Sequence, residues 1–294
     1  MRVVAIVGAG ELGGALAHAL AARNRLTEVR LIDPTAGDIA RAKALDIQQA
    51  GPIQRFDTTI RAASDLSALA GAPTVVVADP AGLGADEWDG AAGLAMLDHV
   101  ARLTPASVIV CARAAHRWVV ERGVGRLGLP RERLLGSAPG AFVAGLRALT
   151  ALEAGGAATD VSIAMLGIPP EGIVVPWNDA TLAGQPLAAV LSPPRLRRLR
   201  ERARALWPPG PYALASACAR VSEAIALGSR RVFCGFAVLD GELEVRRHAL
   251  AFPVSLGTRG IERFISPTLS AHERVQFENA LQPRPGSVLH AGSR

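Results

Sequence analysis

The sequence predicts an α/β fold in which a doubly wound parallel sheet is followed by an α+β second domain. Over the first 140 residues, strand-like apolar runs alternate with helical segments. Such alternation is typical of a parallel sheet covered by helices on both faces. The first apolar run, Val3–Val7, leads directly into a glycine-rich turn. After residue 140 the regular alternation ends, which predicts a second domain of a different kind.

The glycine-rich turn has the spacing of a phosphate-binding unit. Gly8 permits a tight turn off the strand, and Gly10 has no Cβ to keep the backbone away from a pyrophosphate. Gly13 lets the following helix lie close to the sheet. That helix, expected over residues 12–23, points its unpaired amide groups and positive dipole end at the ligand's negative charge. The turn therefore predicts a dinucleotide site at the start of the first helix.

An acidic residue stands where such a unit requires one. Asp33 follows the apolar run at residues 29–32 and lies twenty residues after Gly13. A carboxylate at this position accepts hydrogen bonds from the adenosine ribose hydroxyls and repels a 2′-phosphate, so NAD is favoured over NADP. We therefore predict a Rossmann domain over residues 1–140 with NAD as its cofactor. Its expected cofactor-binding residues are Gly8, Gly10, Glu11, Leu12, Gly13 and Asp33.

The other expected elements follow from the same patterns. In the first half, strands are expected at residues 3–7, 29–32, 58–62, 74–78, 108–112 and 134–137, and helices at 37–49 and 90–102. The second domain is expected over residues 141–282, with a long helix, strands near 161–166 and 173–176, an arginine-rich helix, a helix over 212–227 and two or three strands within 232–256. A last helix starts near Ser270, which forms a capping-box pattern with Glu273. Residues 283–294, rich in proline, glycine and serine, are expected to form a loose tail.

Composition excludes several classes of protein. Half of the 294 residues are hydrophobic and a fifth are charged, which describes a globular chain rather than a disordered one. No apolar run reaches the ~18 residues of a membrane span, and the first strand begins too close to Met1 for a signal peptide. We therefore expect a cytoplasmic protein. Cys111, Cys218 and Cys234 lack metal-binding or disulfide spacing, so we expect small buried side chains and no metal site.

The net charge of +6 raises the question of a nucleic-acid partner. The basic residues are almost all arginine, with Lys43 the only lysine, and the tightest cluster is Arg195, Arg197, Arg198, Arg200, Arg202 and Arg204. Apolar residues recur within this cluster at helical spacing, which predicts a solvated arginine face on an amphipathic helix rather than an anion-binding surface. Aromatic residues form only 4% of the chain, too few for base stacking. We expect neither nucleic acid nor a membrane as partner.

Over nearly its whole length the chain resembles the NAD-dependent malate and lactate dehydrogenases. Besides the glycine turn and Asp33, residues 43–50 read KALDIQQA, which is similar to the family's KALDLxxA helix. Collinear similarities continue at residues 134–137, 166–167, 174–177, 183–187, 212–225, 231–232, 239–242, 253–257 and 260–263. The resemblance implies a Rossmann half and an α+β half with the active site in the crevice between them. It also implies a homodimer or homotetramer.

The resemblance also shows which catalytic groups to look for. In this family a histidine exchanges a proton with the substrate hydroxyl, an aspartate orients that histidine, and an arginine grips the substrate carboxylate. At the matching places this chain has Pro169 for the histidine, Phe142 for the aspartate and Gly145 for the arginine. The resemblance therefore implies a divergent NAD-binding member without the family's hydride-transfer activity, acting in binding or regulation.

Three further positions depart from the family's pattern. Ala114 stands where the family has an asparagine facing nicotinamide and substrate, and Gly210 stands near a substrate-contacting serine or threonine. The mobile loop that should carry two arginines matches residues 79–87, which are acidic and include Asp79. These departures affect substrate binding as well as proton transfer.

The alternative is an active NAD-dependent oxidoreductase that acts on a different hydroxy or keto substrate. Its substitute acid/base group would be His116, flanked by Arg113 and Arg117 and expected just beyond a central strand, where ligands bind. The neighbouring guanidinium groups would lower the pKa of this imidazole. The competing interpretation is a solvated helix start. Glu171 is a weaker candidate and is expected to be a surface carboxylate. The remaining histidines expected to be structural or exposed are His18, His99, His248 and His272.

Overall fold

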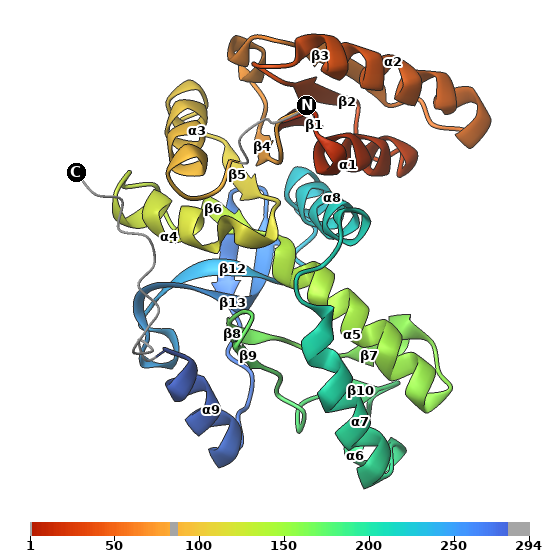
Figure 1. The fold of residues 1–294 in the computed structure, drawn as a ribbon, viewed down its shortest axis with the longest axis vertical. Coiled ribbons are helices and arrows are strands. Elements are labelled where there is room, and N and C mark those ends of the chain that lie inside the picture. Colours follow the sequence, from red (N-terminus) through yellow and green to blue (C-terminus); the bar gives the residue numbers. More distant parts are fainter. Residues whose placement is uncertain (1, 83–87, 282–294) are drawn as a thin grey trace.

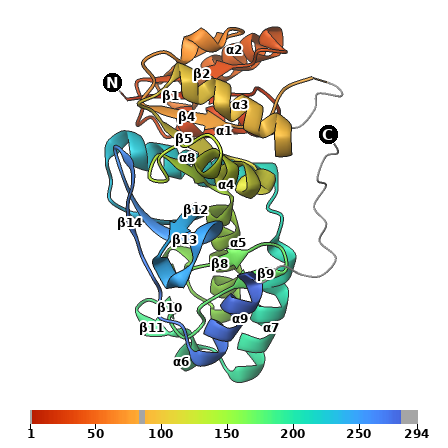
Figure 2. The same cartoon turned by 90° about the vertical axis from the view of Figure 1, so that its left-hand side faces the viewer.

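A computed structural model describes residues 2–82 and 88–281 of the chain (Figure 1). The expected loose tail at 283–294 and residues 83–87 of the acidic loop lie outside the described residues. The first half of the chain forms one end of the molecule and the second half the other (Figures 1 and 2). Within the described residues, no helix combines the length and the apolar character needed to cross a membrane.

The first half contains the predicted doubly wound parallel sheet. Its strands lie in the order β3-β2-β1-β4-β5-β6, and every neighbouring pair is parallel. This is the order of a Rossmann domain, so the predicted fold class is confirmed. The strands are β1 (Val3–Val7), β2 (Glu28–Ile32), β3 (Thr59–Ala63), β4 (Thr74–Val77), β5 (Val108–Cys111) and β6 (Leu134–Gly136). Each begins or ends within two residues of its predicted bounds.

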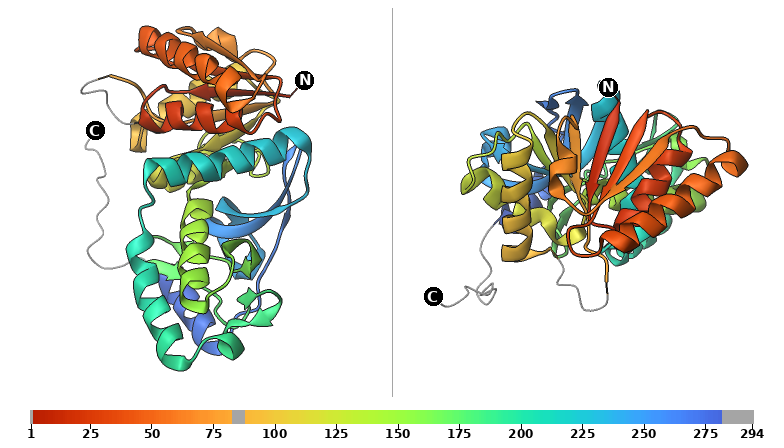
Figure 3. Two further views of the ribbon diagram at one scale, coloured as in Figure 1. Left: turned by 90° about the vertical axis from the view of Figure 1, so that its right-hand side faces the viewer. Right: turned by 90° about the horizontal axis from the view of Figure 1, so that it is seen from above.

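Helices cover both faces of this sheet (Figure 3). Alternate residues of β1 enter two different cores: Val4 and Ile6 pack with residues of α1 (Glu11–Ala22), whereas Val3 and Val7 pack with residues of α3 (Gly90–Leu103) and α4 (Arg117–Gly125). All five residues of β1 are buried. A strand buried on both faces explains why its sequence is continuously apolar rather than alternating.

The second helix, α2 (Gly37–Gln54), is five residues longer than its predicted range. The prediction stopped at residue 49, shortly before Pro52, because proline usually ends a helix. In the structure the helix continues through Pro52 and ends where Arg55 adopts a left-handed conformation, with φ of 61°. The next side chain, Phe56, is buried against the core. Burial of this ring therefore fixes where the helix stops.

The second half extends the same sheet and also forms a small three-stranded sheet of its own. Phe236 of β12 (Val232–Asp240) bridges to Gly136 of β6, and β12 pairs along its length with β13 (Arg246–Gly257). In the part of the chain that the structure describes, the sheet contains eleven strands. The expected domain boundary at residue 140 lies inside helix α5 (Ala138–Ala154), and one apolar core contains residues of both halves. The other strands of this half are β7 (Val161–Ser162), β8 (Leu166–Ile168), β9 (Gly172–Val174), β10 (Thr181–Leu182), β11 (Gln185–Pro186) and β14 (Gly260–Phe264).

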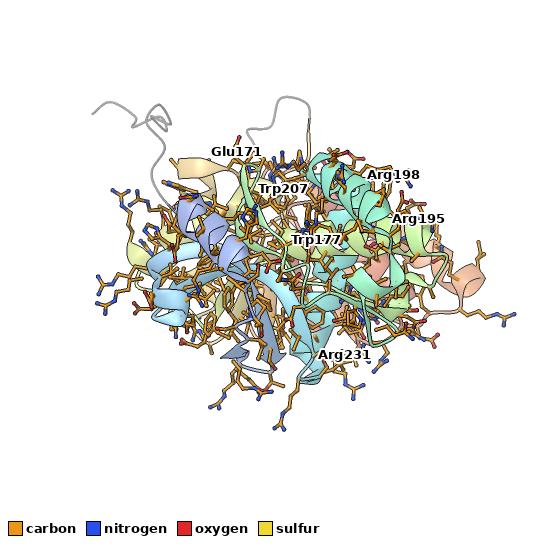
Figure 4. All side chains as sticks on the ribbon, turned by 90° about the horizontal axis from the view of Figure 1, so that it is seen from below. Glu171, Trp177, Arg195, Arg198, Trp207 and Arg231 are labelled. Carbon is orange, nitrogen blue, oxygen red and sulfur yellow. The ribbon has the colours of Figure 1, made fainter. Side chains whose placement is uncertain are left out.

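Helices complete the second half. The α8 helix (Pro211–Leu227) packs on both α1 and α5, and so lies between the two halves (Figures 1 and 2). The arginine-rich helix is α7 (Pro193–Ala203), and its arginines are exposed while Leu199 is buried, as predicted. Figure 4 shows Arg195 and Arg198 together on this helix. Short α6 (Leu187–Val190) precedes it, and α9 (Ala271–Leu281) ends the described chain.

The predicted capping box at the start of α9 is present. The Ser270 amide and hydroxyl both donate to Glu273 Oε2, at 2.9 and 2.8 Å, and the Glu273 amide donates back to Ser270 Oγ at 3.3 Å. The second carboxylate oxygen, Oε1, accepts a hydrogen bond from the Trp177 amide at 2.8 Å. Glu273 therefore fixes the position of a distant loop as well as the helix end.

This arrangement predicts that Glu273 matters more than its serine partner. Ser270→Ala removes one cap and should lower the free energy of unfolding by about 1 kcal/mol. Glu273→Ala also leaves the Trp177 amide without its acceptor, and should lower it by about 2 to 3 kcal/mol. Urea denaturation followed by circular dichroism measures both. Equal losses in the two variants would contradict the loop-fixing role.

Candidate dinucleotide site

The glycine turn, residues 8–14, runs from the end of β1 into the first turn of α1, at the carboxyl end of the parallel sheet. Gly8 has φ of +106°, and a Cβ there would lie 2.3 Å from the Asp79 carbonyl oxygen. A Cβ on Gly13 would lie 2.0 Å from the Gly8 carbonyl oxygen. Only glycine fits at either position, because a side chain on Gly8 would clash with the Asp79 backbone and one on Gly13 would push α1 away from the turn. Leu12 is buried and Glu11 is exposed on the first turn of α1.

The amide groups at the start of α1 are already hydrogen bonded. The Leu12 amide donates to Asp79 Oδ2 at 3.1 Å, and the Gly13 amide donates to Asp79 Oδ1 at 2.7 Å. The Gly10 amide donates to the Asp79 backbone carbonyl at 2.9 Å. Asp79 lies two residues beyond the end of β4. Its carboxylate thus caps the helix at the place where a phosphate would bind.

Lysine binds the same turn from another side. Lys43 projects from α2, and its ammonium group donates to the Ala9 and Gly10 carbonyl oxygens, at 2.8 and 2.6 Å. The amides of the turn therefore face the Asp79 carboxylate, and two carbonyl groups of the turn face Lys43, the only lysine of the chain.

Asp33, the expected ribose-binding residue, is completely buried. Its Oδ2 accepts hydrogen bonds from the Ala9 and Ala81 amides, at 2.9 and 2.8 Å. Its Oδ1 accepts from the Thr35 amide and hydroxyl, at 3.0 and 2.8 Å, and from the Ala36 amide at 3.0 Å. Burial raises the pKa of Asp33, but these hydrogen bonds outweigh it and hold the pKa below the ordinary value of 3.8. The carboxylate organises the protein's own backbone.

These contacts do not fit a bound dinucleotide. Ribose recognition requires an exposed carboxylate oxygen, and Asp33 has none. Pyrophosphate recognition requires free amides and open space beside the second glycine. A Cβ on Gly10 would lie 2.3 Å from Asp79 Oδ2, so the carboxylate fills that space. The predicted residues are brought together, but their binding groups are used internally.

Arg113 and His116 lie at the carboxyl end of β5, as expected, but His116 is not solvated. Its ring is fully buried; Nδ1 accepts from the Arg113 amide at 3.3 Å, and Nε2 lies 3.0 Å from the Trp88 carbonyl oxygen. Burial, with a smaller contribution from the Arg113 charge, lowers the pKa of His116 to about 4 despite the opposing effect of Asp89. The expected solvated helix start is therefore wrong.

The guanidinium group of Arg113 binds Asp89 through two hydrogen bonds, of 2.9 and 3.0 Å. This bidentate pair joins the start of α3 to the segment that precedes α4. Together with the buried His116 ring, it forms a structural link between these two elements. The polar atoms of both side chains are hydrogen bonded within the protein, so neither side chain is placed to exchange a proton with a substrate.

The positions matched to the family's aspartate and arginine lie in apolar surroundings. Phe142 is 1% exposed, and its ring centroid lies 6.4 Å from that of Trp207. Trp207 in turn meets Phe236 edge-on, with centroids 5.9 Å apart. A Cβ on Gly145 would make ordinary contact, at 3.5 Å, with Leu206. An apolar cluster thus occupies these positions.

A pocket of about 670 Å³ lies next to this cluster. Phe142 and Ala203 form part of its wall, and Glu171 and Arg204 are exposed at it. Pro169, at the position of the family's histidine, forms a cis peptide bond with Pro170. In Figure 4, Glu171 and Trp207 lie close together in projection, apart from Arg231.

The other sequence predictions concern isolated residues. All three cysteines are free and buried, as expected, and burial raises the pKa of each thiol to about 11 or 12. Glu171 is exposed, as expected for a surface carboxylate, and no cluster of potential metal ligands occurs within residues 2–82 and 88–281. Besides His116, the histidines within the described ranges are exposed or partly exposed, namely His18, His99, His248 and His272. The sequence pattern places Asp79 only within an acidic loop and does not predict the hydrogen bonds of its carboxylate to the start of α1.

The strand order and the glycine turn define this protein as a Rossmann-type α/β protein with an α+β second half. A family model described as lactate/malate dehydrogenase, alpha/beta C-terminal domain, matches residues 210–283. The malate dehydrogenase of Sorangium cellulosum is 32% identical, covering 99% of each chain, and that of Thioalkalivibrio sulfidiphilus is 30% identical, covering 96% of each. The chain therefore belongs to the lactate/malate dehydrogenase family.

Solved structures support the same fold. The malate dehydrogenase of Salinibacter ruber superposes with a TM-score of 0.84 at 24% identity, covering 95% of this chain and 93% of that one. The lactate dehydrogenase of Cryptosporidium parvum, solved with lactic acid and nicotinamide adenine dinucleotide, gives 0.85 at 22% identity, covering 95% and 94%.

The burial of Asp33 predicts a structural role that a mutation can measure. Asp33→Asn removes the charge that organises five hydrogen bonds and should lower the free energy of unfolding by about 2 to 4 kcal/mol. Because the pKa of Asp33 is lower in the folded state, its stabilisation is present above the ordinary value of 3.8 and is lost as the pH falls through the folded-state pKa. The deficit of the variant should therefore shrink on acidification.

Asp46→Asn, on the exposed side of α2, is the control and should change stability by less than about 0.5 kcal/mol. Urea titrations at several pH values measure both variants. A loss at Asp33 no larger than that at Asp46 would contradict the structural role.

Proposed function

We propose that this chain is a lactate/malate dehydrogenase family member that does not carry out the family's hydride transfer. The observation that carries the proposal is the apolar cluster around Phe142, at the position matched to the aspartate that orients the catalytic histidine. Phe142 is buried against Trp207, which packs on Phe236. A phenyl ring accepts no hydrogen bond of the kind that holds an imidazole in its catalytic tautomer.

The two other positions matched to catalytic residues support the same proposal. Pro169 has neither a titratable side chain nor a backbone amide hydrogen, so it can neither donate nor accept a proton in place of histidine. Gly145 has no guanidinium group to grip a carboxylate, and Leu206 packs beside it. Proton transfer and substrate binding are therefore both affected.

The alternative, an active oxidoreductase using His116, has less support. The buried ring is engaged at both nitrogens, and a pKa of about 4 makes it a poor general base near neutral pH. Homo-oligomer formation and a cytoplasmic location stay predictions from the family resemblance and from the sequence. NAD binding was predicted in the same way, but the contacts of Asp33 and Asp79 oppose it.

The proposal predicts very low activity with the family's substrates. Loss of the general acid/base and of the carboxylate clamp should reduce malate or lactate oxidation, and the reverse reactions, at least about a thousandfold. The measurement is NADH absorbance during steady-state assays, with the malate dehydrogenase of Sorangium cellulosum purified and assayed in parallel. Turnover within about tenfold of that relative would overturn the proposal.

A second prediction tests the apolar cluster directly. Phe142→Asp restores the carboxylate in the absence of its partners and should lower the free energy of unfolding by more than about 3 kcal/mol, because it buries an unpaired charge. Phe142→Leu keeps the position apolar and should cost only about 1 to 2 kcal/mol. Thermal and urea unfolding compare the two. An aspartate as well tolerated as leucine would show that polar partners reach this position.

A further inference from the structure

The hydrogen bonds at the start of α1 differ from those that the family resemblance implies. In this fold the pyrophosphate is bound by the amides of the first helical turn, and the second glycine lets it approach. Here the Leu12 and Gly13 amides bind both oxygens of the Asp79 carboxylate, at 3.1 and 2.7 Å. We propose that Asp79 is a built-in substitute for the phosphate and excludes dinucleotides while it caps α1.

Asp79 occupies the space that a phosphate would need, in addition to accepting the hydrogen bonds that a phosphate would accept. Gly10 has no Cβ, and the volume that this leaves beside the backbone contains Asp79 Oδ2, only 2.3 Å from where a Cβ would lie. The Asp79 backbone carbonyl also binds the Gly10 amide at 2.9 Å. The main chain and side chain of one residue thus cover three amides of the turn.

The residues around Asp79 hold it in this position. We call residues 79–81 the closing segment. At one end Asp79 binds the glycine turn, and at the other the Ala81 amide donates to the buried Asp33 carboxylate at 2.8 Å. The same Asp33 oxygen binds the Ala9 amide of the turn at 2.9 Å. Moving the closing segment away would break both sets of contacts and leave buried amides without acceptors.

The negative charge of Asp79 also opposes the binding of a phosphate group. A pyrophosphate that approached this helix would meet a carboxylate of like sign at contact distance. Lys43 does not neutralise that carboxylate through its observed contacts, because its ammonium group donates to the Ala9 and Gly10 carbonyl oxygens. The excluded ligands are those that bind through a diphosphate, namely nicotinamide adenine dinucleotide and other dinucleotides. This inference is argued from the contacts of Asp79 and not from the proposed loss of hydride transfer, although exclusion of NAD would itself prevent that reaction.

The test is nucleotide binding by the whole protein before and after Asp79 is changed. Asp79→Ser keeps a short helix-capping oxygen, removes the charge and opens the space beside Gly10. NADH fluorescence titration should give no saturation up to about 1 mM with the unchanged protein and saturable binding at least about tenfold tighter with the variant. Inorganic pyrophosphate should compete with NADH in the variant, which would place the gained contact at the phosphate end.

Asp65→Ala is the matched control, since Asp65 also caps a helix through its side chain, accepting from the Ser67 amide at 2.7 Å, but at η1 (Leu66–Leu69). It should gain no NADH binding. If Asp79→Ser fails to fold by circular dichroism, the NADH titration of the unchanged protein decides the outcome, because saturable binding below about 1 mM would overturn the proposal. Binding of NADH by the unchanged protein as tightly as by the variant would overturn the proposal. A folded variant that still binds no NADH would overturn it too.

Discussion

Two carboxylates that hold the amides of the glycine turn determine the arrangement around β1. A turn from a buried strand into a helix leaves several amide groups without partners, and each needs an acceptor. Asp79 supplies acceptors at the start of α1, and Asp33 supplies them to Ala9, to Ala81 and to the residues that precede α2. The ends of β1, β2 and β4 are thereby joined without a ligand. In this structure the protein itself provides the acceptors that a bound nucleotide would provide.

The second half of the molecule shows a comparable replacement with different chemistry. Where the family resemblance places charged and proton-transferring groups, Phe142, Trp207 and Phe236 pack together, and Leu206 lies beside Gly145. These contacts stabilise by burying apolar area and not by holding a substrate. The family's sheet and helices persist, while the Asp79 carboxylate lies at the start of α1 and apolar side chains lie at the positions matched to the catalytic aspartate and arginine. The fold of this chain therefore does not by itself imply the family's activity.

Much of the fold followed from the sequence because its signals are local. The apolar run of β1, the glycine spacing and the Ser270–Glu273 pattern each depend on residues close together in the chain. The extent of α2 did not follow from the sequence, because it depends on burial of Phe56. The expected domain boundary at residue 140 falls inside α5, and the two halves share an apolar core and the large sheet, which no local sequence signal reveals.

The site was less predictable for a physical reason. The partners of Asp79 are backbone amides of residues 66 or 67 positions earlier, and backbone amides leave no trace in residue types. The sequence signal that could have pointed to it is an aspartate just after a buried strand that neighbours β1. Burial of His116 was missed similarly, since it depends on Trp88 and Asp89 folding over the ring. Asp33 was placed correctly in the chain, but its hydrogen bonds go to the protein's own backbone.

The most direct test of the central claim is residue-specific amide hydrogen exchange, measured by NMR, at Leu12 and Gly13 in nucleotide-free protein. If Asp79 occupies the phosphate position, both amides exchange slowly without any ligand, and adding NADH leaves their rates unchanged. Fast exchange at both amides that slows when NADH is added would contradict the account, because it would show that the cradle is open and that the nucleotide fills it.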